Sequence, residues 1–207
     1  MDNSESMTRK IFFTFIYLSI GFVSFGQVTR AEEGIMSQAY SKDIAEYMVK
    51  EYVIKEILMV PDKQTIEVEI NALTASKSGE LTTVVYDCKE LKKRGLIFGF
   101  WNSNTNEFNV HYKGYAFRNF EFNKAKELLD NLDLVLEEKK AILSRDNNEN
   151  LAKNAVYKFD DVIFLFYIDE LGSSLIRVMW NGYDSEWNQK NLKTMKKRFY
   201  KFFIPEK

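Results

Sequence analysis

The stretch that decides the fold is residues 162–168, which read VIFLFYI. Every position is apolar or aromatic, so a strand built from these residues would have two apolar faces, which is typical of a covered strand inside a sheet. Residues 155–159 precede it, and residues 174–181 follow it after a turn around Gly172. Both flanking segments are rich in the β-branched and aromatic residues that strands favour. The sequence therefore predicts a sheet here, with residues 162–168 as its central strand.

A helix is predicted after this group of strands and after an earlier one. The last helix is expected to begin at Ser185, with an apolar face formed by Leu192, Met195, Phe199 and Phe202. Asn123 is a candidate N-cap for the other helix. That helix would place on one face Ala125, Leu128, Leu129, Leu132, Val135 and Ile142.

The first half of the chain follows the same order of strands and then a helix. A helix is expected over residues 31–51, and apolar residues from Tyr52 to Val60 favour a strand that ends at the Pro61-Asp62 turn. Further strands are predicted over residues 66–70, 81–88, 95–102, 107–112 and 115–120, the last two hinged at Gly114. Strands joined by short turns, with helices after each group, predict an α+β fold with a mainly antiparallel sheet covered by helices.

A short internal echo accompanies this order. Residues 111–115 read HYKGY and residues 179–183 read MWNGY, and each motif precedes a predicted helix. An internal β-β-α duplication and a chance match of short motifs are both open explanations. Residues 27–207 are expected to form a single α+β domain, and a subdivision near residues 144–154, which are mostly polar, is the alternative.

The first 26 residues have the pattern of a secretory signal peptide. Arg9-Lys10 precede residues 11–25, which carry no charge, and small residues stand at Ser24 and Gly26. The uncharged run is shorter than the roughly 20 residues that a membrane-spanning helix needs, so cleavage after Gly26 is favoured over an uncleaved anchor. After cleavage we expect no transmembrane segment.

The ending Ser-Phe-Gly-Gln of this segment resembles the signal peptides of secreted proteins from Bacteroidota-type bacteria. The resemblance covers about the first thirty residues and implies an exported protein, periplasmic or extracellular. Translation is expected to begin at Met1 or at Met7, which stands just before the basic pair.

Charge and rare residues exclude several classes of function. The chain has 29 basic and 30 acidic side chains, which gives a net charge of -1. A protein that binds nucleic acid through phosphates would normally show a basic excess, so nucleic acid is not an expected partner. Cys88 is the only cysteine and His111 the only histidine, which excludes an internal disulfide and a Cys/His zinc cluster. No metal site and no cofactor are expected.

The candidate site residues are aromatic or basic. Aromatic residues make up 15% of the chain, and a surface cluster could bind a glycan or a peptide. Its weak candidates are Trp101, His111, Tyr115, Trp180 and Tyr183. A basic face on the last helix is formed by Lys193, Lys196, Lys197 and Arg198. That face is expected either to be the solvated side of a sheet-covering helix or to make peripheral contact with an anionic surface.

These features favour an exported binding or interaction module over an enzyme, because no catalytic motif is present. The partner is an unknown protein, peptide or glycan. The alternative is a periplasmic or secreted hydrolase that uses the strand-end carboxylates Asp160, Asp161 and Asp184. A structural component of an envelope assembly is the third hypothesis, and a large exposed apolar patch would favour it.

Overall fold

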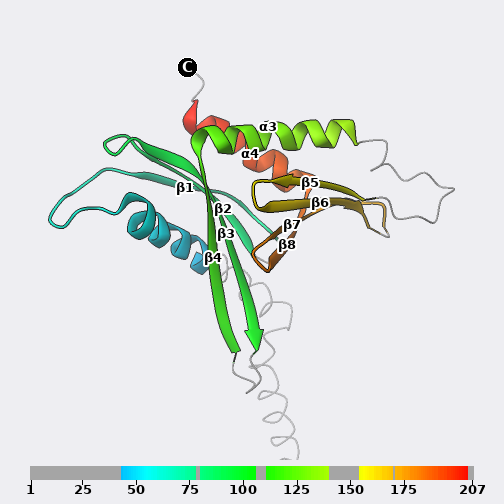
Figure 1. The fold of residues 1–207 in the computed structure, drawn as a ribbon, viewed down its shortest axis with the longest axis horizontal. Helices are drawn as coiled ribbons and strands as arrows, with labels where there is room; N and C mark the ends of the chain where they lie inside the picture. The colour runs from blue at the N-terminus through cyan, green and yellow to red at the C-terminus, as the bar shows by residue number, and fades with distance from the viewer. Residues whose placement is uncertain (1–42, 78–79, 106–110, 140–153, 170, 205–207) are drawn as a thin grey trace, which may run out of the picture. The chain divides into compact units, whose positions relative to one another are not determined.

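The computed structural model describes residues 43–77, 80–105, 111–139, 154–169 and 171–204 (Figure 1). The described residues belong to one compact unit. Within it, eight strands form two four-stranded antiparallel sheets, each in simple sequential order. The predicted α+β fold with antiparallel pairing is therefore confirmed, with two sheets in place of one.

The first sheet contains β1 (Glu69–Ala75), β2 (Leu81–Cys88), β3 (Lys93–Thr105) and β4 (His111–Glu121). The helix α3 (Phe122–Glu138) follows β4 directly and covers one face of this sheet (Figure 1). The other face packs against a helical stretch, residues 43–52, which continues as the π-helix η1 (Val53–Leu58). The first sheet is thus covered on both faces.

The second sheet contains β5 (Ala155–Phe159), β6 (Val162–Ile168), β7 (Ser174–Trp180) and β8 (Tyr183–Asn188). The helix α4 (Gln189–Phe203) follows β8 and lies beside α3 (Figure 1). β6 is an interior strand, as predicted. Val162, Phe164 and Phe166 are fully buried in the main core, and Ile168 is partly buried against it. The odd-numbered residues are only partly buried on the opposite face, so the core covers this strand on one face, whereas the apolar run predicts cover on both faces.

The main hydrophobic core joins both halves of this unit. Phe98 of β3 contacts Phe164 of β6 and Trp187 of β8, with ring centroids 6.4 and 5.9 Å apart. Leu192, Met195 and Phe199 of α4 are buried in the same core, which confirms the predicted apolar face of the last helix. A second, smaller core lies between residues 43–58 and the first sheet.

The predicted strand from Tyr52 to Val60 is wrong, because this segment continues the preceding helix. Ala45, Val49 and Val53 repeat every four residues and are all buried, so they form one helical stripe. Gly99 leaves room for this stripe, since a Cβ atom there would lie 2.3 Å from Cγ2 of Val49. Packing of the stripe on the sheet overrides the β preference of the valines and isoleucines. The prediction of a helix over residues 31–51 is confirmed for residues 43–51, and its earlier part lies outside the described residues.

Two further boundaries differ from the prediction in the first half. Residues 111–121 form one continuous strand, so Gly114 is not a hinge, and residues 106–110 lie outside the description. A Cβ atom at Gly114 would lie 2.9 Å from the Tyr183 hydroxyl. Glycine is needed here because this hydroxyl lies so close to the β4 backbone. Asn123 is not the N-cap of α3, because the helix begins at Phe122 and its N-cap is Glu121, two residues before Asn123.

Ser185 does not begin the last helix but is buried within β8. The backbone enters β8 through Asn181-Gly182, which both have positive φ, as a two-residue hairpin turn requires. The helix begins at Gln189 instead, where Asn188 and Asn191 cap each other's backbone N–H groups at 2.9 and 3.2 Å. Each half is therefore four antiparallel strands followed by a helix, whatever the origin of the internal echo.

Candidate functional site

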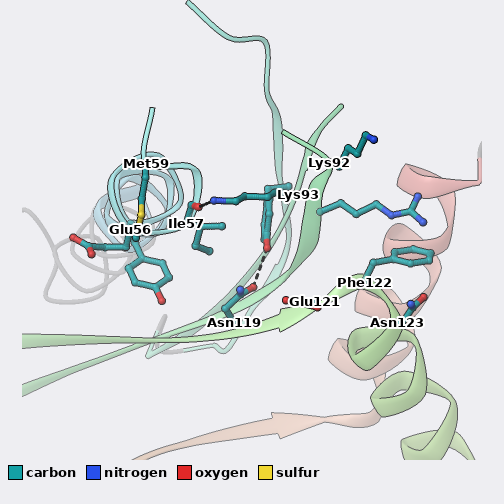
Figure 2. A pocket seen from close by; sticks show the side chains of 12 residues that line it. Glu56, Ile57, Met59, Lys92, Lys93, Asn119, Glu121, Phe122 and Asn123 are labelled. Carbon is teal, nitrogen blue, oxygen red and sulfur yellow. Dashed lines mark hydrogen bonds between the residues drawn. The ribbon is translucent and has the colours of Figure 1, made fainter. Parts of the chain in front are cut away.

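A polar cavity of about 540 Å³ opens between the end of η1 and the start of α3 (Figure 2). Its walls come from four separate stretches of the chain: the helical segment, β2, the turn that leads into the start of β3, and the junction between β4 and α3. The lining residues are Tyr52, Glu56, Ile57, Met59, Tyr86, Lys92, Lys93, Arg94, Asn119, Glu121, Phe122 and Asn123.

The floor of the cavity includes a tyrosine that reaches across a neighbouring strand. Tyr86 of β2 stands opposite Gly95 of β3, and its hydroxyl donates a hydrogen bond of 3.1 Å to Oδ1 of Asn119 on β4 (Figure 2). A Cβ atom at Gly95 would lie 2.9 Å from this hydroxyl and 2.4 Å from the Phe120 carbonyl oxygen. Glycine is therefore required at this position for the tyrosine to reach Asn119.

Burial raises the pKa of Tyr86 to about 12, and the nearby Glu121 carboxylate adds to the shift, against the opposing effect of the Asn119 hydrogen bond. The hydroxyl is therefore protonated at every physiological pH. It acts as a neutral hydrogen-bonding group and leaves the side-chain NH₂ of Asn119 as a donor.

Three consecutive basic residues form one wall. Lys93 donates a hydrogen bond to the Ile57 carbonyl and so ties η1 to the sheet (Figure 2). The Arg94 guanidinium lies 4.0 Å from the centroid of the Phe122 ring, a cation–π arrangement that orients its planar donors. Lys92 is exposed and has a φ of 52°, which places it at the turn before β3.

The remaining walls add carboxylates and a second tyrosine. Glu56 of η1 and Glu121 at the end of β4 are both exposed. The Tyr52 ring stacks on Phe117 at 4.6 Å, and burial together with the Glu56 carboxylate raises its pKa. The cavity thus presents cations, carboxylates and neutral hydrogen-bonding groups to the same space.

The predicted aromatic candidates do not form one cluster. Trp101 stands directly opposite Tyr115, on the face of the first sheet that also carries Phe117, where Tyr52 of the helical segment stacks. Trp180 and Tyr183 instead contact Phe100, which faces the main core, at 5.6 and 6.2 Å. Phe100 and Trp101 are neighbours in β3 and therefore point to opposite faces of the first sheet. The pair Trp101 and Tyr115 and the pair Trp180 and Tyr183 thus lie on opposite sides of this sheet.

His111 is the first residue of β4 and pairs with Thr105, but its side chain lies outside the described part. Cys88 is buried in the smaller core, where it behaves as an apolar side chain.

The predicted basic face of α4 divides into free and engaged residues. Lys193 and Lys197 are exposed. Lys196 forms ion pairs with Asp133 and Asp130 of α3, and Arg198 donates a hydrogen bond to the Leu73 carbonyl. Two of the four cations therefore hold α4 against its neighbours.

The strand-end carboxylates that were the hydrolase candidates are engaged in ion pairs. Asp161 accepts hydrogen bonds from Arg118 at 2.6 Å and from the Trp180 indole at 2.8 Å, and Asp160 lies 3.4 Å from the same guanidinium. Burial alone would raise the pKa of Asp161, but these hydrogen bonds outweigh it and lower the pKa. We call this group, Arg118, Asp160, Asp161 and Trp180, the clasp, because it joins β4 of the first sheet to the second sheet.

Asp184 lies away from the clasp. It pairs with Arg177 at 3.0 Å on the face of the second sheet that points away from the core. The three carboxylates therefore do not converge on one substrate position.

Across the residues that the structure describes, no cluster of three or more potential metal ligands occurs. Within the same residues, no helix combines the length and apolarity needed to cross a membrane. Residues 1–26, which are the predicted signal peptide, lie outside the described residues.

Sequence reasoning did not identify the cavity, because its lining residues are distant along the chain. The one local signal is the basic run Lys92-Lys93-Arg94 before Gly95, which lies between the predicted strands 81–88 and 95–102. No protein-family model, curated protein or solved structure matches this chain. The chemistry of the cavity itself is therefore the basis for a functional proposal.

Proposed function

We propose that this chain is an exported binding module and that its ligand is a short peptide carrying charges of both signs, held in the cavity at the start of α3. The observation that carries the proposal is the convergence of opposite charges on one space. Lys92 and Arg94 line the cavity together with Glu56, and aromatic rings and an amide lie between them. The volume of about 540 Å³ falls within the range of about 300–1,000 Å³ that is usual for ligand sites.

Each wall suits a different part of a peptide. The Arg94 guanidinium presents a planar set of donors that matches a carboxylate. Glu56 offers an acceptor for an ammonium group. The Tyr86 hydroxyl and the Asn119 amide can both donate and accept, so they suit the peptide bond itself.

Charge favours a peptide over a neutral glycan. Glycan binding would rest mainly on exposed aromatic faces, and the predicted aromatic residues are divided between two sides of the first sheet. The cavity lining, in contrast, includes three basic and two acidic residues: Lys92, Lys93, Arg94, Glu56 and Glu121.

Binding is also favoured over hydrolysis. Tyr86 stays protonated near neutral pH and cannot act as a base there. A hydrolase with two carboxylates requires both to face one substrate bond. Here Asp161 is held in the clasp, and Asp184 pairs with Arg177 on another face.

The test is isothermal titration calorimetry with a set of tripeptides that each contain one lysine and one glutamate side chain. At least one member should bind, and Arg94→Gln or Glu56→Gln should each weaken that binding about tenfold, the effect of losing roughly 1.4 kcal/mol of charge-assisted hydrogen bonding. Lys197→Gln is the matched control, since it removes an exposed cation on α4 and should leave the affinity unchanged.

Increasing salt should reduce the affinity, because the charges of this open cavity are screened. If no tripeptide of the set binds, or if the Arg94 and Glu56 variants bind as well as the unmodified chain, the proposal is refuted.

A further inference from the structure

The second sheet has one apolar face that lies outside the hydrophobic cores. The even-numbered residues of strand β6 point into the main core. Ile163 and Leu165 point to the opposite side of the sheet and belong neither to the main core nor to the smaller core. Leu175 and Met179 of β7 share this face, and Val156 of the edge strand β5 is 67% exposed. We call this surface the outer face of the second sheet.

Strand register arranges the outer face in rows that cross all four strands. The first row runs Lys158, Ile163, Met179, Asp184 from β5 to β8. The second row runs Val156, Leu165, Arg177, Glu186 in the same order. A third row places Tyr167 beside Leu175, with Asn188 next on β8. The outer face thus has a lysine at one edge and carboxylates at the other, and its two interior strands carry apolar residues together with Tyr167 and one cation, Arg177.

We propose that the outer face binds a second copy of this chain, as a face-to-face dimer with its two-fold axis parallel to the strands. Rotation about such an axis reverses the order of the strands, so β5 of one copy faces β8 of the other. Each row of one copy then faces the same row of the second copy. Lys158 then lies over Asp184 of the second copy, and Ile163 lies over its Met179. The first row is therefore complementary to itself in both charge and apolar character, as a two-fold interface requires.

The charges select this arrangement over the other face-to-face dimer. A two-fold axis across the strands would stack β5 on β5 and β8 on β8, and such an axis over the first row would place Lys158 against Lys158 and Asp184 against Asp184. Like charges across an interface are unfavourable. The parallel axis also matches the usual packing of sheets, about 10 Å apart with nearly aligned strands.

The ion pairs within one copy are consistent with this arrangement. Lys158 has no ion-pair partner among the described residues, so its charge is available to a second copy. Within one copy, Arg177 pairs with Asp184 at 3.0 Å, and the Glu186 carboxylate accepts a hydrogen bond of 2.6 Å from the Tyr167 hydroxyl. Arg177 and Glu186 therefore each keep a polar partner when two outer faces meet.

Strand geometry also sets the strength of the contact. Four strands about 4.8 Å apart, with about six residues of 3.4 Å each, give a planar area of roughly 400 Å² per copy. This area belongs to the small class of protein interfaces, which form weak and reversible complexes. The dimer should accordingly dissociate on dilution.

Sedimentation velocity of the full chain at low salt, from about 5 to 500 μM, tests the proposal. The sedimentation coefficient should rise with concentration towards that of a dimer. Lys158→Glu and Asp184→Lys should each weaken dimerisation at least tenfold, because each places like charges at both ends of the first row. Lys193→Glu is the control for the change of charge and should leave dimerisation unaltered.

Mixing the two single variants gives the most specific outcome. A copy with Lys158→Glu and a copy with Asp184→Lys are complementary to each other along the first row, so the mixture should form a heterodimer although neither variant dimerises alone. A chain that stays monomeric at every concentration would overturn the proposal. So would a dimer that neither substitution weakens, or a mixture that does not associate.

Discussion

Removing the Phe199 side chain is expected to destabilise the fold strongly, because that ring joins the two helices that follow the sheets. Phe199 of α4 is fully buried and stacks on Phe122, the first residue of α3, with ring centroids 5.8 Å apart and planes 13° apart. Phe203 packs edge-on against the same ring at 4.9 Å. Its other neighbours in the core include Leu192 and Met195 of the same helix, also fully buried, so a cavity left here could not collapse easily.

Phe199→Ala should therefore lower the free energy of unfolding by about 3 to 5 kcal/mol, the usual cost of deleting a buried phenylalanine. For a chain of this size, each kcal/mol lowers the melting temperature by about 2 to 4 °C, so a decrease of about 6 to 20 °C is expected. Urea unfolding followed by far-ultraviolet circular dichroism measures the first quantity, and a thermal scan measures the second.

Phe202→Ala is the matched control, since Phe202 lies on the same helix but is only partly buried. Phe202→Ala should lower the free energy of unfolding by less than half as much as Phe199→Ala does. If Phe199→Ala instead costs under about 1 kcal/mol with the near-ultraviolet spectrum unchanged, α4 does not pack on the core as described.

Three other predictions concern surface charge, pH and processing. Lys196→Gln should lower the free energy of unfolding by up to about 1 kcal/mol because it breaks the pairs with α3, whereas Lys197→Gln should have no measurable effect in the same urea titration. Because the pKa of Asp161 is lowered in the folded chain, its stabilising contribution is complete above the unfolded pKa of about 3.9 and is lost as the pH falls through the folded pKa. The Asp161→Asn variant should thus have a lower free energy of unfolding than the unmodified chain at pH 6, and the difference should shrink at acidic pH. Equal free energies of unfolding at pH 6 would contradict the role of the clasp. Mass spectrometry of exported protein should find Gln27 at the N-terminus, and a chain that retains residues 1–26 would contradict the predicted signal peptide.

Much of the fold could be predicted where local pattern and packing agree. Residues 81–88, 155–159 and 162–168 form strands with the predicted limits. Their apolar residues are dense and β-branched or aromatic, and the core to which they belong needs the same residues. The buried face of α4 was predictable for the same reason, since its apolar residues recur at helical spacing.

The errors occurred where tertiary contacts decide between two local patterns. Val53 favours a strand by its type, yet it continues the stripe of Val49 that packs over Gly99. The strand β8 was missed because its outward residues are polar, although its inward Ser185 and Trp187 alternate with them. The Asn181-Gly182 pair is a recognised hairpin signal and could have identified that strand.

The cavity could not be predicted from sequence, because no two of its walls are linked by a motif. Tyr86 and Asn119 are 33 residues apart and meet only because β2, β3 and β4 pair in register across Gly95. The aromatic candidates were misplaced for a related reason. Residue type identified them as binding groups, but only the pairing shows that Trp101 and Trp180 lie on different sides of the first sheet.

Mapping a bound ligand onto the chain shows whether the cavity or the aromatic pair Trp101 and Tyr115 is the binding site. A ¹H–¹⁵N correlation spectrum of the full chain should be recorded during titration with the tripeptide that calorimetry identifies. Binding in the cavity should shift the backbone amides at Lys92–Gly95, Asn119–Asn123 and residues 56–59, with little change at Trp101 and Tyr115. Shifts centred on Trp101 and Tyr115, with none at the cavity, would contradict binding in the cavity.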